Sequence, residues 1–113
     1  ALPAYKTYSD RAKFSEAVLA ASIYKGAAEI AVQTKNAAKA DLDAGSNGIP
    51  AADDPGALSG TYVTGADMTD GVITIETNLG TTADYRLEAT VTAAGGLTWA
   101  VAGASTCLAQ GLC

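Results

Sequence analysis

The pattern of apolar and polar positions divides the chain into a helical first third and a strand-like remainder. From Ala4 to Lys39, apolar residues recur at helical spacing, and the segment contains one glycine and no proline. Such a composition, rich in alanine, predicts one long helix over residues 4–39. At about 1.5 Å per residue, this helix would be roughly 50 Å long.

The predicted helix has two apolar stripes on different sides. The first stripe contains Tyr5, Ala12, Leu19, Ile23, Ala27, Ile30 and Ala37. The second contains Phe14, Val18, Ala21, Ala28 and Val32. Because one small sheet covers one side of a helix, we expect the first stripe to face the core and the second to face neighbouring copies. With the N-terminal end added, the predicted subunit-packing residues are Leu2, Tyr5, Phe14, Val18, Ala21, Ala28 and Val32.

Residues 40–71 predict a long surface loop. Asn47-Gly48, Asp54-Pro55-Gly56 and Asp70-Gly71 are turn signals, and the segment has no helical pattern. About thirty such residues are unusual in a compact domain and indicate a functional loop.

Three stretches with alternating apolar residues follow, at residues 72–77, 85–92 and 97–101. Short glycine-bearing linkers join them, which favours an antiparallel meander of three or four strands within residues 72–102. The fold class is therefore α+β, a single domain in which the long helix covers one face of the sheet. The predicted core residues are Leu19, Ile23, Ile30, Ile73, Ile75, Leu87, Val91 and Trp99.

Charge is unevenly distributed along the chain. Residues 1–39 carry six cations and three acids, a net charge of +3, whereas residues 40–113 carry one cation and nine acids, a net charge of −8. We call residues 40–113 the head. The basic helix of one copy is expected to attract the acidic head of another copy. Because phosphate contacts require lysine and arginine, the acidic head argues against nucleic acid as a partner.

The sequence contains no recognisable catalytic motif. The chain has no histidine, its serines have no evident base partner, and no phosphate-binding glycine motif precedes a helix. We therefore expect neither an enzyme nor a cofactor. Asp41, Asp43 and Asn47 weakly resemble a calcium loop, but a solvated acidic turn is the better interpretation.

Two cysteines, Cys107 and Cys113, lie at the end of the chain. A close pair at this position suits a disulfide that ties down the terminal segment, since two thiolates without histidine fall short of four metal ligands. A disulfide in turn indicates an exported protein.

The first residues of the chain resemble those of a known family. The motif comprises Ala1-Leu2-Pro3-Ala4-Tyr5, Tyr8, Arg11-Ala12-Lys13 and Ser15-Glu16-Ala17. It resembles the segment of type IV pilins, most closely type IVa major pilins, that follows their membrane-spanning half-helix. The order of parts is similar too: a long helix, an αβ-loop, an antiparallel sheet, and a disulfide loop at residues 107–113 after a strand that contains tryptophan.

This resemblance implies a subunit of an extracellular pilus. A hydrophobic N-terminal segment with a methylated N-terminus would anchor it in the inner membrane before assembly and pack in the fibre core afterwards. Its partners would be identical subunits and the pilus assembly machinery. Such fibres serve adhesion, twitching motility, biofilm formation or DNA uptake. Two alternatives stay open, a type II secretion pseudopilin and a DNA-binding minor pilin for competence.

Overall fold

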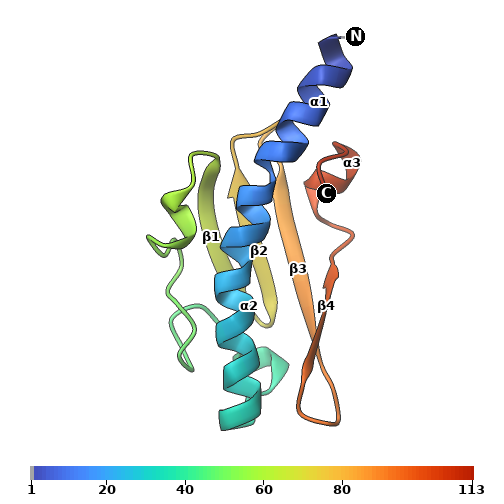
Figure 1. The fold of residues 1–113 in the computed structure, drawn as a ribbon. Helices are drawn as coiled ribbons and strands as arrows, with labels where there is room; N and C mark the ends of the chain where they lie inside the picture. The colour runs from blue at the N-terminus through green and yellow to red at the C-terminus, as the bar shows by residue number, and fades with distance from the viewer. Residues whose placement is uncertain (1) are drawn as a thin grey trace.

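A long helix lies across one face of a four-stranded antiparallel sheet (Figure 1). The computed structural model describes the backbone of residues 2–113 and the side chains of residues 5–113. The molecule is elongated, with principal extents of 50 × 27 × 16 Å. Figure 1 shows that the first part of the helix projects beyond the sheet and that both chain ends lie at that end of the molecule.

The helix consists of α1 (Leu2–Lys13) and α2 (Ser15–Lys35), separated by the single residue Phe14. Phe14 keeps helical dihedrals, with φ of −64° and ψ of −15°. Its N–H donates to the Asp10 carbonyl at 2.8 Å, and its own carbonyl accepts from Ala17 at 2.9 Å. The turn is therefore locally tightened rather than broken, and the two helices form one nearly continuous rod.

The helix ends at Lys35, so the predicted end at Lys39 is wrong. Asn36 adopts the left-handed conformation, with φ of 52° and ψ of 39°, and its N–H donates to the Ala31 carbonyl. Asparagine tolerates this conformation better than most residues and often ends helices this way. The alanines that follow Asn36 have high helix propensity, so the pattern predicted that the helix continues past Asn36. A short 3₁₀ turn, η1 (Lys39–Asp41), comes next.

The sheet has the strand order β1-β2-β3-β4 with every neighbouring pair antiparallel, which confirms the meander. The strands are β1 (Val63–Thr69), β2 (Val72–Thr77), β3 (Asp84–Val91) and β4 (Leu97–Val101). Asp70 and Gly71 join β1 to β2 with positive φ values of 49° and 81°. Two positive φ values define the type I′ turn that matches the twist of a two-residue hairpin.

Strand β1 was not predicted, because its residues were assigned to the loop of residues 40–71. The register between β1 and β2 shifts between Val63 and Gly65, which marks a bulge. As a result Gly65 and Ala66 are both buried, and the alternation of buried and exposed positions breaks. Glycine and aspartate are also rare in strands. The αβ-loop therefore ends at residue 62, and the sheet begins at Val63.

The core combines small residues from the helix with large residues from the sheet. The buried apolar residues of the helix are Phe14, Ala17, Ala20, Ala21, Tyr24, Ala28, Ala31 and Val32. The sheet supplies larger buried side chains, including Met68, Ile73, Ile75, Tyr85 and Leu87. The rings of Phe14 and Tyr85 meet edge to face, with centroids 5.8 Å apart. Alanine on the helix lets its backbone approach the sheet closely.

The two helix stripes are therefore largely exchanged relative to the prediction, with Ile23 still packed against the core and Val18 still exposed. Four residues expected at subunit contacts are buried in the domain: Phe14, Ala21, Ala28 and Val32. Two residues expected in the core, Leu19 and Ile30, are 67% and 61% exposed. The prediction placed the stripe with the larger aliphatic residues in the core. In this fold the large buried side chains come from the sheet, and the helix carries small side chains where it contacts the sheet.

The αβ-loop spans residues 36–62 and includes the short 3₁₀ turn η2 (Ala57–Ser59). It is held by apolar anchors at Leu42, Ile49 and Ala57, all of which are buried. The Tyr24 hydroxyl donates to the Ala51 carbonyl at 2.8 Å. Burial raises the pKa of Tyr24 above its ordinary value, so this hydroxyl stays protonated as a donor.

Candidate assembly surface on the helix

The side of the helix that faces away from the sheet carries several large apolar side chains. Tyr5, Tyr8, Leu19 and Ile30 are each more than half exposed, and Val18 is 48% exposed. Tyr8, Leu19 and Ile30 are eleven residues apart, which is close to three whole helical turns. They therefore lie almost on one line along the rod. We call Tyr5, Tyr8, Leu19, Gly26 and Ile30 the outer helix surface.

Small residues leave this surface shallow between its larger members. Gly26 is exposed, and a Cβ added there would meet nothing within 4 Å. Ser22, one turn earlier, is also exposed. A flat surface between two large side chains allows a second helix to approach closely, because small residues let helix backbones pack near each other.

A groove of about 180 Å³ adjoins the outer helix surface on the side of the αβ-loop. It is lined by Glu16, Leu19, Ala20, Ile23, Gly56, Ala57, Ser59 and Gly60. Glu16 is fixed there, because its carboxylate accepts the Tyr62 N–H at 3.1 Å. The groove thus lies between the outer helix surface and the loop.

The other residues predicted for packing or core have mixed positions. Tyr5 and Val18 are exposed, as a contact with a partner requires, whereas the Leu2 side chain lies outside the described residues. Ile73, Ile75 and Leu87 are buried. Partly buried residues packed against the core include Ile23, Val91 and Trp99.

Trp99 lies at the margin of the core rather than inside it. Its indole N–H donates to the Glu29 carboxylate at 3.3 Å, and the Lys25 ammonium lies 5.9 Å from the ring centroid. The indole therefore contacts α2 through two charged side chains. Lys25 and Glu29, one turn apart on α2, both contact this ring.

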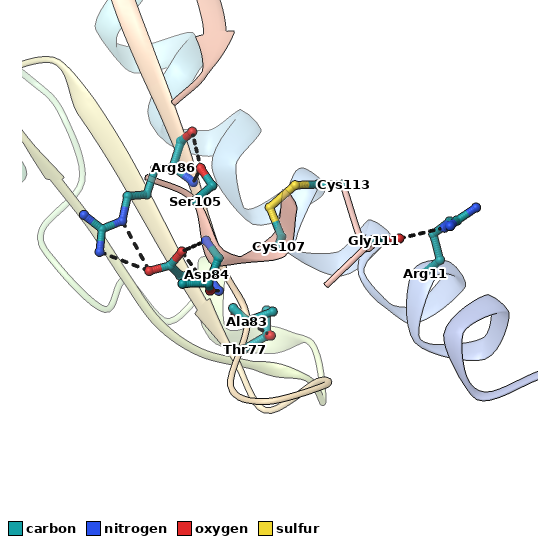
Figure 2. Close-up of a disulfide and its surroundings, with 10 residues drawn as sticks. Arg11, Thr77, Ala83, Asp84, Arg86, Ser105, Cys107, Gly111 and Cys113 are labelled. Carbon is teal, nitrogen blue, oxygen red and sulfur yellow. Dashed lines mark hydrogen bonds and ion pairs between the residues drawn. A yellow bond between two sulfur atoms is a disulfide. The ribbon is translucent and has the colours of Figure 1, made fainter. Parts of the chain in front are cut away.

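The C-terminal segment is closed by the Cys107–Cys113 disulfide, which confirms the predicted pairing (Figure 2). The two Cα atoms are 5.4 Å apart, and Cys107 is fully buried. Arg11 of α1 donates from Nε to the Gly111 carbonyl at 3.0 Å. This bond joins the disulfide loop to the projecting part of the helix, as Figure 2 shows.

Asp84 holds the same segment to β3. One carboxylate oxygen accepts from the Thr106 N–H at 2.7 Å, at the start of α3 (Thr106–Ala109), and the other accepts from Arg86 at 3.1 Å (Figure 2). Burial raises the pKa of Asp84, but the hydrogen bonds from Thr106 and Arg86 outweigh this effect and hold the pKa below its ordinary value. The sequence contains no signal that pairs Asp84 with Thr106, so this contact was missed.

The residues that weakly resemble a calcium loop have structural contacts. An Asp43 carboxylate oxygen accepts the Asp70 N–H at 2.8 Å, and the Asn47 amide donates to the Asp41 carbonyl at 2.9 Å. Within residues 5–113, no group of three or more metal-binding side chains comes together. Across the described helices, none is long and apolar enough to cross a membrane.

The long helix on a four-stranded antiparallel meander, the αβ-loop between them and the C-terminal disulfide together make up the type IV pilin fold, and the chain is pilin-like. It is similar to the type IV pilus subunit protein TapA of Aeromonas hydrophila, with 45% identity over 51 residues. The match covers 45% of this chain and 35% of that relative, about a third of its length. No family model matches the chain.

Proposed function

We propose that this chain is a structural subunit of a type IV pilus filament, assembled from identical copies through the outer helix surface. The observation that carries the proposal is the exposure of Tyr5, Tyr8, Leu19 and Ile30 along one side of the helix. Large apolar side chains in a row on a protein surface mark interaction sites. The similarity to a type IV pilus subunit supports a pilus as the assembly in this proposal.

In this proposal the exposed surfaces have different positions in the filament. The helix points toward the fibre axis and the outer face of the sheet points outward. A hydrophobic segment ahead of α1 holds the subunit in the inner membrane before assembly, and the finished filament is extracellular. The filament then serves adhesion, twitching motility, biofilm formation or DNA uptake.

The charge distribution favours a structural role over direct DNA binding. Residues 40–113 carry a net charge of −8, and their one cation, Arg86, is bound to Asp84 at 3.1 Å. A DNA-binding pilin requires several phosphate contacts from cations. For the type II secretion alternative, calcium-dependent stabilisation in a thermal melt would favour a pseudopilin over the proposed pilus subunit.

The test replaces one exposed apolar side chain with a charge. In cells that assemble this chain, we expect Leu19→Glu to lower the filaments released by shearing by about tenfold or more, because an unpaired charge is costly in an apolar contact. Thr64→Glu, at an exposed position on β1, is the matched control and should assemble normally. Both purified variants should melt near the temperature of the parent chain.

Two outcomes would contradict the proposal. Leu19→Glu filaments at the parent level would show that the outer helix surface is not a subunit contact. A parent chain that reaches the cell surface yet never enters sheared filaments would contradict the filament function itself.

A further inference from the structure

The outer edge of strand β4 exposes unpaired backbone groups. In the pairing with β3, Ala102 donates to the Arg86 carbonyl and Thr92 donates to the Gly96 carbonyl. Hydrogen-bonded pairs alternate with non-bonded pairs along an antiparallel ladder. The N–H and C=O groups of Leu97, Trp99 and Val101 therefore point away from β3. Within the described part of the chain, no segment bonds to these groups.

Most of the devices that usually protect an edge strand are absent from β4. Such edges are blunted by charged side chains, proline, bulges or a covering segment. Residues 97–101 contain neither a charged residue nor proline, and their register with β3 is continuous. The strand is only five residues long, and shortness is its one protective feature. In Figure 1, β4 is the right-hand strand of the sheet.

The charge around this edge favours a second copy as the partner. The chain has a net charge of −5, so two copies repel each other at long range. Residues 89–113, which include β4 and the disulfide loop, contain no aspartate, glutamate, lysine or arginine. Two copies that approach through β4 therefore meet where side-chain repulsion is smallest.

The order of side chains along β4 is also self-complementary. Trp99 is the central residue, Leu97 and Val101 lie two positions to either side, and Thr98 and Ala100 lie between them. If two such strands pair antiparallel about Trp99, each Leu97 faces the partner's Val101. All six outward backbone groups of each strand then find partners. The half-buried Trp99 and the 40% exposed Val101 come together on the helix side of the joined sheet.

We infer that β4 is a lateral contact between copies of this chain, in which two β4 strands pair antiparallel about Trp99 to make one eight-stranded sheet. The contact goes beyond assembly through the helix and does not depend on it. Five residues at about 3.4 Å each span roughly 17 Å, so the interface is smaller than a stable dimer needs. Two isolated chains therefore associate weakly. Where many copies are held side by side, many such contacts form together and the association is strong.

The test uses disulfide trapping with purified chains. In the inferred pairing, Thr98 of one copy and Ala100 of the other form a non-hydrogen-bonded pair, with Cα atoms about 4.5 Å apart, close enough for a disulfide. Both positions are exposed on the outer face of the sheet. In a glutathione buffer, a mixture of Thr98→Cys and Ala100→Cys should give on the order of tenfold more crosslinked heterodimer than Thr98→Cys mixed with Ser59→Cys.

A second pair of variants tests the backbone groups. Val101→Pro, placed in both cysteine chains, removes an outward N–H and should reduce the heterodimer to the control level. Val101→Ala keeps that N–H and should leave most of the heterodimer. Melting temperatures of the proline and alanine chains must agree closely, since proline is tolerated on edge strands.

Salt provides an independent readout. Because β4 itself carries no charged residue and the copies carry like net charge, crosslinking should rise as salt screens their repulsion. Three results would each overturn the inference: equal crosslinking in the test and control mixtures, a Thr98→Cys homodimer that exceeds the heterodimer, or crosslinking that falls with salt. None of these results bears on the helix surface, whose test counts filaments in cells.

Discussion

The two outer edges of the sheet, β1 and β4, differ in whether another segment of the chain bonds to them. On the β1 edge, the outward Ala66 N–H donates to the Asp53 carboxylate at 2.9 Å, and the Ala66 carbonyl accepts the Asp53 N–H at 2.7 Å. The Met68 carbonyl accepts the Ala44 N–H at 2.8 Å. On the β4 edge, the corresponding groups of the described chain have no such partners.

The difference shows what the αβ-loop contributes. The loop contains little regular structure, yet it closes one edge of the sheet with bonds from its backbone and from Asp53. An edge closed in this way cannot accept a foreign strand. The exposed acids of the loop also keep that side of the molecule charged. The chain therefore has one edge closed to association and one edge open to it.

The largest expected effect comes from removing the anchor of the loop. Tyr24→Ala should lower the free energy of unfolding by about 3–5 kcal/mol, because Tyr24 is fully buried and its hydroxyl bonds the Ala51 carbonyl. Tyr24→Phe keeps the ring and should lose about 1 kcal/mol. Urea denaturation measures both values. Equal losses in the two variants would mean that the hydroxyl, and not the ring, anchors the loop.

A smaller loss is expected on the β4 side when the disulfide is removed. The double variant Cys107→Ser with Cys113→Ser should be less stable by about 2 kcal/mol, the chain-entropy value for a loop this short. Thermal melts of the parent under oxidising and reducing conditions provide the control, since reduction should reproduce the variant. Unchanged melting after full reduction would show that the bonds of Asp84 and Arg11 are sufficient to hold the segment.

Opening the closed edge directly should have a more local effect. Asp53→Ala leaves the Ala66 N–H without its acceptor and places alanine at a φ of 55°, so we expect a loss of about 1–2 kcal/mol. Asp53→Asn keeps an acceptor oxygen and tolerates the same φ, so it should lose less. Hydrogen exchange of the Ala66 amide should be faster in the alanine variant alone. Unchanged exchange at Ala66 would mean that water replaces the carboxylate without cost.

The smallest effect is a pH dependence at the C-terminal segment beyond β4. The folded-state pKa of Asp84 lies below its ordinary value of 3.8, so Asp84 stabilises the fold above about pH 4. That contribution is lost as the pH falls below 3.8 and through the lower folded-state pKa. Denaturation between pH 6 and pH 3 should show a steeper fall for the parent than for Asp84→Asn. Parallel curves would exclude Asp84 as the responsible acid.

The sequence predicted the elements better than it predicted their contacts. The helix, three of the four strands, the meander and the disulfide follow from local signals such as alternation in residues 85–92 and the close pair Cys107 and Cys113. Strand β1 could not be predicted by alternation, because its bulge at Gly65 places two neighbouring residues on the buried side. The helix stop at Asn36 was hidden because the alanines that follow it favour a helix.

The exposed surface of the helix was predicted on the wrong side for a physical reason. Leu19 and Ile30 are among the most hydrophobic residues of the helix and are exposed, whereas most of the buried residues of the helix are alanines. Which stripe a sheet covers depends on how close the helix must come, and that distance is set by the side chains of the partner strands. The distance between helix and sheet thus depends on strand residues far away in the sequence, and the apolar pattern of the helix alone does not reveal it.

The near-parallel course of the helix and the strands has a mechanical consequence. The helix α2 lies along the sheet, and α1 extends past it at the end where the C-terminus is fixed by the disulfide and by Arg11 (Figure 1). Tension applied through α1 therefore acts along the helix–sheet contact as shear. The buried side chains of α2 must then slide together rather than separate one after another. Because the Cys107–Cys113 disulfide closes residues 107–113 into a covalent ring, the same pull cannot extend that segment.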